Sequence, residues 1–259
     1  QWVRNTEEER LLGVSLTGIL DNKMMTNQTN DNLGSLLDSL RLTAVSTNRK
    51  WSKYLGIESS AAITCVKPSG TVSQLVDAAS GIHPRHSDYY IRTVRADKKD
   101  PLTKFMTEKG FPVEDELLKP QSMSVFSFPV KAPRGALTRN SLSAIDHLKV
   151  WQVYSNHWCE HKPSITVSIQ ENEWMEVGSY VYKHFDEMSG ISFLPMSEHT
   201  YRQAPYQDTT RKDYEDLLKK MPKDVDWQAL SEYEEEDNTM GSQTLNCTGD
   251  VCEVVDIVQ

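Results

Sequence analysis

Residues Lys67-Pro68-Ser69-Gly70-Thr71-Val72-Ser73-Gln74 form the most informative segment of this chain. The six residues before it, AAITCV at 61–66, are apolar or β-branched and are typical of a buried strand. The residues after its turn, 72–79, are mostly apolar or small and contain neither proline nor glycine, which predicts a helix. The Pro-Ser-Gly-Thr join places serine and threonine where helices take their N-cap. The pattern therefore predicts a strand, a tight turn and a helix.

A strand–turn–helix unit of this kind can bind an anion. The first amides of a helix lack internal partners and carry the positive end of the helix dipole. Gly70 permits close approach of a ligand to the backbone, Ser69 and Thr71 bring hydroxyl donors, and Lys67 adds a positive charge. Phosphate is the anion that this donor set suits. The alternative is an ordinary capped turn without a ligand, and spacing alone does not separate the two.

The composition sets limits on the class of protein. A chain of 259 residues with 38% hydrophobic residues can form one large domain or two small ones. Its apolar runs are too short to span a bilayer and no signal peptide opens it, so we expect a cytoplasmic protein. A net charge of −9 argues against binding to a nucleic-acid backbone. The first residue is glutamine, so we expect a processed chain or a fragment of a longer one.

Strand-like and helix-like segments alternate along the chain, which predicts an α/β fold. Strands are expected at 61–66, 89–94, 123–130, 164–169 and 191–195, and helices at 33–54, 72–79, 101–110, 144–158, 175–188 and 210–221. From residue 231 the chain is acidic and has little to bury, which indicates a mobile tail. We therefore expect three parts: a body at 1–206, a charged helical extension at 207–230 and a tail at 231–259.

Two of the four cysteines lie in that tail, as Cys247-Thr248-Gly249-Asp250-Val251-Cys252. A turn through residues 248–250 would bring the sulfur atoms within bonding distance. An exposed pair of this kind exchanges readily with other disulfides, which favours a redox role in a reducing compartment. A metal clip or two inactive thiols are the alternatives, and a metal site would need two further ligands.

Three other groups of residues have both a functional and a structural interpretation. His157, Cys159 and His161 have alternate spacing that suits zinc, but only three ligands are local, which favours a structural or substrate-pocket role. The loop that contains His83, Arg85 and His86 either contacts a nucleotide or shapes the chain after the predicted phosphate helix. Cys65 is expected to be a small buried thiol, and Trp151 and Trp158 are expected in the core.

Several motifs, taken in order, resemble the C-terminal part of the adenosylcobalamin-dependent (class II) ribonucleotide reductases, of the monomeric type that reduces ribonucleoside triphosphates. The resemblance covers about residues 10 to 255. The motifs that carry it are GVSLTG at 13–18, TCVKPSGTVSQL at 64–75, GIHPRHS at 81–87, YYIR at 89–92, YRQAPY at 201–206 and the terminal cysteine pair.

The resemblance implies a ten-stranded α/β barrel, of which this chain holds only the later strands, and a flexible C-terminal tail. It implies that a loop grips the substrate phosphates and that the tail pair Cys247 and Cys252 re-reduces the active site and is itself reduced by thioredoxin. The phosphate-binding residues implied are Lys67, Pro68, Ser69, Gly70, Thr71 and Ser73. The radical-bearing cysteine and its partners lie upstream in this family, so this chain alone should be inactive and should need the N-terminal half of the barrel.

Two other functions remain as alternatives. The first is the large subunit of an iron-dependent ribonucleoside-diphosphate reductase, which relays its radical through tyrosines in a late strand. The strand at 164–169 reads SITVSI and has no tyrosine, which favours the cobalamin type. The second is a non-catalytic module that binds phosphate or exchanges disulfides. It predicts nucleotide binding without any partner domain, or thiol exchange that survives destruction of the phosphate loop.

Overall fold

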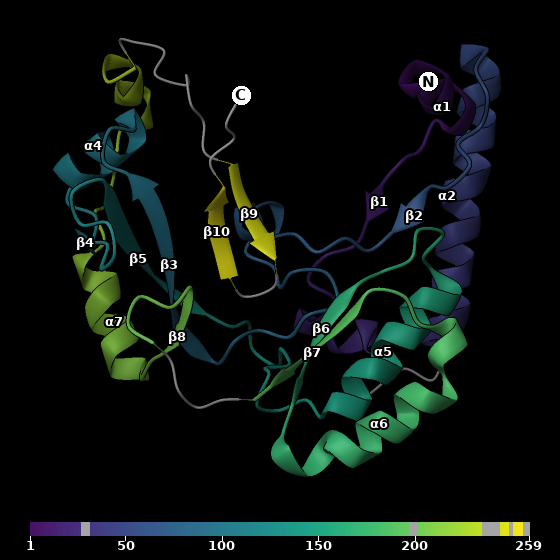
Figure 1. Cartoon of the computed structure of the whole chain (residues 1–259). Coiled ribbons are helices and arrows are strands. Elements are labelled where there is room, and N and C mark those ends of the chain that lie inside the picture. Colours follow the sequence, from purple (N-terminus) through teal and green to yellow (C-terminus); the bar gives the residue numbers. More distant parts are fainter. Residues whose placement is uncertain (27–31, 197–200, 235–243, 249–250, 256–259) are drawn as a thin grey trace. The chain divides into compact units, whose positions relative to one another are not determined.

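The structure is a computed structural model that describes residues 1–26, 32–196, 201–234, 244–248 and 251–255 (Figure 1). The chain forms two compact units, each made of two separate stretches of sequence. Unit 1 comprises Gln1–Arg85 and Ala132–Met196, and unit 2 comprises His86–Lys131 and Ser197–Gln259. The α/β class predicted from the sequence is confirmed. The division into a body, an extension and a tail stays a prediction.

Unit 1 contains most of the helices and two short parallel sheets. Its helices are α1 (Trp2–Glu9), α2 (Leu33–Leu55), α3 (Val72–Leu75), α5 (Ala144–His157) and α6 (Trp174–Lys183), with 3-10 turns η1 (Ile19–Asp21), η2 (Lys23–Met25), η3 (Glu171–Glu173) and η4 (Phe185–Glu187). Its strands are β1 (Val14–Ser15), β2 (Thr64–Cys65), β6 (Ile165–Ile169) and β7 (Ile191–Pro195), and they pair in parallel as β1 with β2 and β6 with β7.

The core of unit 1 lies around α5. Ser143 is the N-cap of this helix: its hydroxyl oxygen accepts a hydrogen bond from the Asp146 amide at 3.1 Å. The predicted core position of Trp151 is confirmed, since the side chain is buried and its indole nitrogen donates to the Pro163 carbonyl oxygen. Strand β6 alternates between buried and half-buried positions, which places its three isoleucine and valine side chains in the same core.

Unit 2 is built on an antiparallel sheet. Its elements are β3 (Tyr89–Asp97), α4 (Pro101–Glu108), β4 (Val113–Asp115), β5 (Met123–Lys131), β8 (Tyr206–Asp208), α7 (Arg211–Lys220), η5 (Trp227–Glu232), β9 (Thr244–Thr248) and β10 (Val251–Val255). Four of the strands form one sheet in the order β4-β5-β3-β8, and β9 pairs with β10 as a separate hairpin. Strands β3 and β5 pair over nine residues, from Tyr89 opposite Lys131 to Asp97 opposite Met123.

The core of unit 2 is an aromatic cluster. Phe105 of α4 is fully buried, and its ring centroid lies 5.5 Å from that of Trp227 and 5.4 Å from that of Tyr233. The hydroxyl group of Tyr233 donates to the Glu108 carboxylate. Aromatic pairs at these separations contribute beyond the area they bury. This cluster therefore attaches the segment after α7 to helix α4.

The stretch at 201–206 is hydrogen-bonded to the segment at 114–117 of unit 2. Gln203 has a positive φ of 63° and a buried side chain. Its amide nitrogen donates to the Glu114 carboxylate at 2.9 Å and to the Asp115 carbonyl oxygen at 2.8 Å, and its amide oxygen accepts from the Leu117 N–H at 3.0 Å. Three hydrogen bonds to one short segment fix its path, so this motif has a structural use of its own.

The predicted helices are wrong in extent at two places. Helix α3 ends at Leu75 rather than at 79, because Asp77 takes a positive φ of 47° and the Ala78 N–H donates back to the Ser73 carbonyl oxygen at 2.8 Å. The helix expected at 175–188 divides into α6 and the 3-10 turn η4 at His184. In the described part of the chain, no helix has both the length and the apolar character needed to cross a membrane.

Candidate functional site

The loop between β2 and α3 offers three backbone N–H groups to an incoming ligand. Gly70, Thr71 and Val72 are exposed, and within the described residues their amides donate no hydrogen bond. The amides of Lys67 and Ser69 are engaged, with the Ser15 hydroxyl oxygen at 3.2 Å and the Ser80 hydroxyl oxygen at 2.7 Å. The part of the loop that can receive an anion is therefore 70–72.

The side chains around those amides suit the same purpose. Lys67 and Pro68 are exposed at the start of the loop, and the Thr71 side chain caps no helix amide. A Cβ atom added at Gly70 would meet no atom of the chain within 4 Å, so the loop itself has room for a ligand above this residue. Amides, a hydroxyl group and one ammonium group at one turn form a donor set that matches phosphate oxygens.

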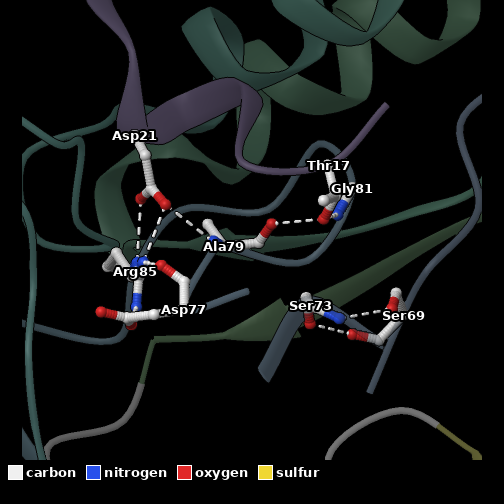
Figure 2. Close-up of polar contacts among 8 residues, drawn as sticks. All are labelled: Thr17, Asp21, Ser69, Ser73, Asp77, Ala79, Gly81 and Arg85. Carbon is white, nitrogen blue, oxygen red and sulfur yellow. Dashed lines mark hydrogen bonds and ion pairs between the residues drawn. The ribbon is translucent and has the colours of Figure 1, made fainter. Parts of the chain in front are cut away.

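Two of the predicted phosphate-binding serines bind each other instead of facing outward (Figure 2). The hydroxyl oxygen of Ser69 accepts a hydrogen bond from the Ser73 N–H at 2.9 Å, and the Ser73 hydroxyl donates to the Ser69 carbonyl oxygen. Ser73 is fully buried. Ser69, and not Thr71, therefore caps the first turn of α3, and both serines hold the loop closed. Their contact with phosphate stays a prediction.

The chain after α3 is held by a buried ion pair. The Arg85 guanidinium, only 3% exposed, donates to both carboxylate oxygens of Asp21, from Nε at 2.9 Å and from Nη2 at 2.8 Å (Figure 2). Its Nη1 atom also donates to the Asp77 carboxylate at 3.1 Å. The sequence left open whether Arg85 contacts a nucleotide or shapes this loop. Its burial and its partners favour the second interpretation.

His83 and His86 belong to different units. In unit 1 the Nε2 atom of His83 accepts from the Thr166 N–H at 3.0 Å, so its Nδ1 carries the proton and donates to the Ser80 carbonyl oxygen at 3.0 Å. In unit 2 the Nε2 atom of His86 lies 3.2 Å from an Asp208 carboxylate oxygen, and its ring stacks on Tyr206. His83 thus also shapes the loop, and its predicted contact with a nucleotide is not tested.

Sequence reasoning missed His147, which lies beneath the same segment. The residue is 3% exposed, and burial lowers the pKa of its imidazole to about 4. Its Nε2 atom bonds the Ile82 carbonyl oxygen at 2.5 Å. A neutral imidazole that donates from Nε2 satisfies this buried acceptor. No sequence pattern marked the residue, because it occupies an ordinary position on an amphipathic helix.

The stretch at 157–161 clamps strand β2. The carboxylate of Glu160 accepts from the amides of Ile63 at 2.8 Å and Thr64 at 3.1 Å. Trp158 is buried, as predicted, and its indole nitrogen donates to the Cys65 carbonyl oxygen at 2.8 Å. These contacts support the structural alternative for this stretch.

The two candidate zinc ligands on either side of that clamp have protein partners. His157 bonds Asp38 at 2.8 Å, and Nε2 of His161 bonds the Leu12 carbonyl oxygen at 3.0 Å. Burial raises the pKa of the Cys159 thiol to about 12, which favours the protonated form over the thiolate that a metal requires. Cys65 is a buried free thiol, as predicted. Among the residues that the structure describes, no group of three or more potential ligands is placed to hold a metal.

The tail cysteines occupy matching positions on the β9–β10 hairpin. Cys247 stands directly opposite Cys252 in the antiparallel register, next to the pair Thr248 and Val251. Directly opposed residues have Cα atoms about 4.5–5.5 Å apart, which lies within the range that a disulfide spans. The predicted turn includes residues 249–250, which lie outside the described residues, as do residues 235–237 of the acidic segment that starts at 231.

The fold is similar to part of a solved enzyme structure. A solved B12-dependent (class II) ribonucleotide reductase matches the structure with a TM-score of 0.76, over 90% of this chain and 36% of that chain, at 22% sequence identity. No protein-family model matches the chain.

Curated relatives match the chain over most of its length. An adenosylcobalamin-dependent ribonucleoside-triphosphate reductase of Euglena gracilis is 28% identical over 94% of this chain and 33% of its own length. A probable enzyme of the same name from Dictyostelium discoideum is 31% identical over 71% of this chain and 24% of its own length. An adenosylcobalamin-dependent ribonucleoside-triphosphate reductase of Lactobacillus acidophilus is 25% identical over 85% of this chain and 30% of its own length.

The resemblance predicted from the sequence is therefore confirmed: over most of its length this chain is similar to adenosylcobalamin-dependent ribonucleoside-triphosphate reductases. The chain spans about a third or less of the length of these relatives.

Proposed function

We propose that this chain supplies the C-terminal part of an adenosylcobalamin-dependent ribonucleotide reductase, which converts ribonucleoside triphosphates to 2′-deoxyribonucleoside triphosphates. The observation that carries the proposal is the similarity to the Euglena gracilis reductase over 94% of the chain. The relatives reported above are all named as adenosylcobalamin-dependent, which supports this type over the iron-dependent alternative. The product would serve deoxyribonucleotide synthesis and DNA replication.

The sheets of unit 1 support a place within a larger barrel. Parallel strands normally occur in larger sheets that are covered on both faces, whereas β1–β2 and β6–β7 are pairs in the described part of the chain. A two-stranded parallel sheet is marginal by itself. The missing neighbours would come from the part of the reductase that the relatives possess and this chain does not include. We therefore propose that unit 1 contributes later strands of a ten-stranded α/β barrel and is inactive alone.

The loop at 67–73 is proposed to bind the substrate phosphates. The exposed amides of 70–72, the Thr71 hydroxyl and the Lys67 ammonium would donate to phosphate oxygens. Pro68 limits the backbone before Ser69, and the Ser69–Ser73 hydrogen bonds hold together the two ends of the segment that contains these amides. Charge-assisted hydrogen bonds of this kind are about twice as strong as neutral ones.

Adenosylcobalamin would supply the radical that begins reduction of the ribose. The donors that the loop exposes are amides and hydroxyl groups at a single turn, which suit a phosphate and not the broad face of a corrin ring. This loop therefore does not fit the cofactor, and we propose that the contacts of the cofactor fall at least partly on the rest of the enzyme. The role of this chain is to bind and orient the substrate.

The tail is proposed to carry reducing equivalents. Reduction of the ribose leaves a disulfide in the active site, and the Cys247 and Cys252 thiols would reduce it by exchange while becoming a disulfide themselves. A dithiol protein such as thioredoxin would then reduce the tail. The facing register of the two residues supports this proposal, because directly opposed residues have Cα atoms within the range that a disulfide spans.

The phosphate assignment is tested by replacing Thr71 with valine in an enzyme reconstituted from this chain and the upstream part that its relatives possess. Loss of a donor to a charged group costs about 1.5–3 kcal/mol, which corresponds to at least a tenfold weaker binding of a ribonucleoside triphosphate in isothermal titration. Thr43→Val is the matched control, since the Thr43 hydroxyl bonds Ser39 within α2. Unchanged affinity in Thr71→Val would contradict the assignment.

A further inference from the structure

We infer that Arg85 is a positioning residue for the candidate phosphate loop, and that it acts through Asp21 and Asp77. These three residues are called the Arg85 clasp. The inference rests on the proposed function of the loop at 67–73 and extends it to residues that contact no ligand.

The geometry of the clasp is specific. The guanidinium forms a two-pronged contact with Asp21, with donor–acceptor distances of 2.9 and 2.8 Å, and a third contact with the Asp77 carboxylate at 3.1 Å (Figure 2). It also donates to the Asp77 carbonyl oxygen. The Asp21 side chain is 13% exposed, whereas that of Asp77 is 76% exposed. The clasp therefore has a buried arm and a solvent-facing arm.

The buried arm is connected to the chain that follows α3. The Oδ2 atom of Asp21, which accepts a hydrogen bond from Nη2 of Arg85, also accepts one from the Ala79 N–H at 2.8 Å. The Ala79 carbonyl oxygen in turn accepts from the Thr17 hydroxyl at 2.9 Å. The residue after it, Ser80, accepts the Ser69 amide at 2.7 Å. A continuous path of contacts thus runs from Arg85 to the first residues of the loop.

The exposed arm reaches the other end of the loop. Asp77 lies two residues beyond α3 in a left-handed conformation, and Ala78 next to it closes the turn onto Ser73. Ser73 is hydrogen-bonded to Ser69. The clasp therefore fixes both the segment that anchors the loop at Ser69 and the turn that ends its helix, and the exposed amides of 70–72 lie between these two attachments.

A positioning role explains why a charge is buried here. A buried ion pair gives little net stability, because removing both charges from water costs nearly as much as their attraction returns. Its value is directional: the planar guanidinium holds two carboxylates in a fixed arrangement that a lysine ammonium does not reproduce. The chain thus uses the clasp for geometry rather than for stability.

The main test is Arg85→Lys in the reconstituted enzyme, with ribonucleoside-triphosphate reduction measured over a range of substrate concentrations. We expect KM to rise about tenfold while kcat changes little, because the loop binds the phosphates and does not take part in the ribose chemistry. Arg41→Lys is the matched control, since Arg41 forms a half-buried ion pair with Asp38 at 3.2 Å within α2. It should leave both constants unchanged.

A second variant separates positioning from stability. Asp77→Gly removes the exposed carboxylate but places glycine at a φ of 47°, where it is favoured, so the melting temperature should stay the same or rise. KM should nevertheless increase by about two- to fivefold, which is the change in affinity that corresponds to the interaction free energy of one exposed ion pair. If Arg85→Lys does not fold, this variant decides alone. An unchanged KM in Asp77→Gly, or a KM that follows the melting temperature, would overturn the inference.

The same assays distinguish this inference from the proposed function. If Thr71→Val weakens triphosphate binding and the clasp variants do not, the loop binds phosphate but Arg85 does not position it. If binding of the triphosphate is insensitive to Thr71→Val as well, the loop is not the phosphate site and both proposals fail.

Discussion

The two units of this protein differ in the type of sheet they contain and in the groups they bury. Unit 1 places polar groups inside: the Arg85 guanidinium on Asp21, the His147 imidazole on a carbonyl oxygen and the Trp151 indole on another. Unit 2 packs aromatic rings around Phe105 and pairs its strands antiparallel over nine residues. Buried polar contacts fix directions, whereas apolar burial fixes mainly volume. Unit 2 also buries a polar side chain, that of Gln203, but the candidate phosphate loop lies in unit 1, so placement of a substrate is expected of unit 1.

The largest expected effect concerns the tail, which belongs to unit 2. In the reconstituted enzyme, Cys247→Ser should abolish multiple turnover with thioredoxin, because a lone thiol cannot complete the exchange. Turnover with a small dithiol should be largely retained, since such a reductant reaches the active site directly. Steady-state rates with the two reductants measure this difference.

The matched control for the tail variant is Cys159→Ser in unit 1. The thiol of Cys159 has a raised pKa and is expected to take no part in exchange, so both rates should stay the same. Equal loss of activity with both reductants in Cys247→Ser would remove the shuttle role and would leave unit 2 without a redox function.

The second effect is on the stability of unit 2. Phe105→Ala empties the centre of the aromatic cluster and should lower its free energy of unfolding by about 3–5 kcal/mol at any pH between 4 and 8. Trp227 is the one tryptophan in the sequence of unit 2, so ¹⁹F NMR of 5-fluorotryptophan-labelled protein in urea reports this unit separately. The control variant is Leu118→Ala, at an 88% exposed position, which should change the free energy of unfolding of unit 2 by less than about 0.5 kcal/mol. If Phe105→Ala lowered the free energy of unfolding of unit 2 by no more than Leu118→Ala does, the aromatic cluster would not be what stabilises unit 2.

The third effect is the pH dependence that His147 gives to unit 1. The pKa of His147 is about 4 in the folded protein against 6.5 for the ordinary group, so below pH 6.5 the unfolded chain binds a proton that the folded chain does not. The stabilisation is complete above pH 6.5 and falls as the pH approaches 4, by about 3 kcal/mol at 1.36 kcal/mol for each pKa unit.

Urea unfolding at several pH values, followed through the unit 1 fluorotryptophan signals, measures this loss. His147→Gln keeps a donor for the Ile82 carbonyl oxygen and should flatten the pH dependence, whereas His161→Gln at a half-buried position should not. An equally steep pH dependence in His147→Gln would mean that other groups in unit 1 cause it.

Local signals were sufficient for many elements. Asp100, Ser143 and Thr210 each accept a hydrogen bond from the first turn of a helix, at α4, α5 and α7, close to where the sequence places these helices. The alternation of β6 and the buried tryptophans of unit 1 also follow the sequence pattern. Caps and periodicity depend on near neighbours, so they can be recognised without the fold.

The candidate site was predictable in its location but not in its construction. The turn at 67–73 was recognised from its own residues, whereas the engagement of Ser69 with Ser73 and Ser80 was not. Arg85 suggested a ligand contact as readily as a structural one. The residues that decide its role are eight and 64 positions away in the sequence, at Asp77 and Asp21.

The sequence by itself determined the relationship to the cobalamin-dependent reductases, the α/β class and the position of the loop, because these depend on motifs and periodicities that are local. The tertiary structure alone decided which polar groups face outward, where α3 ends and that each unit is assembled from two separate stretches of chain. The physical reason is that the cost of burying a charge or a hydroxyl group depends on the partner that the fold brings to it.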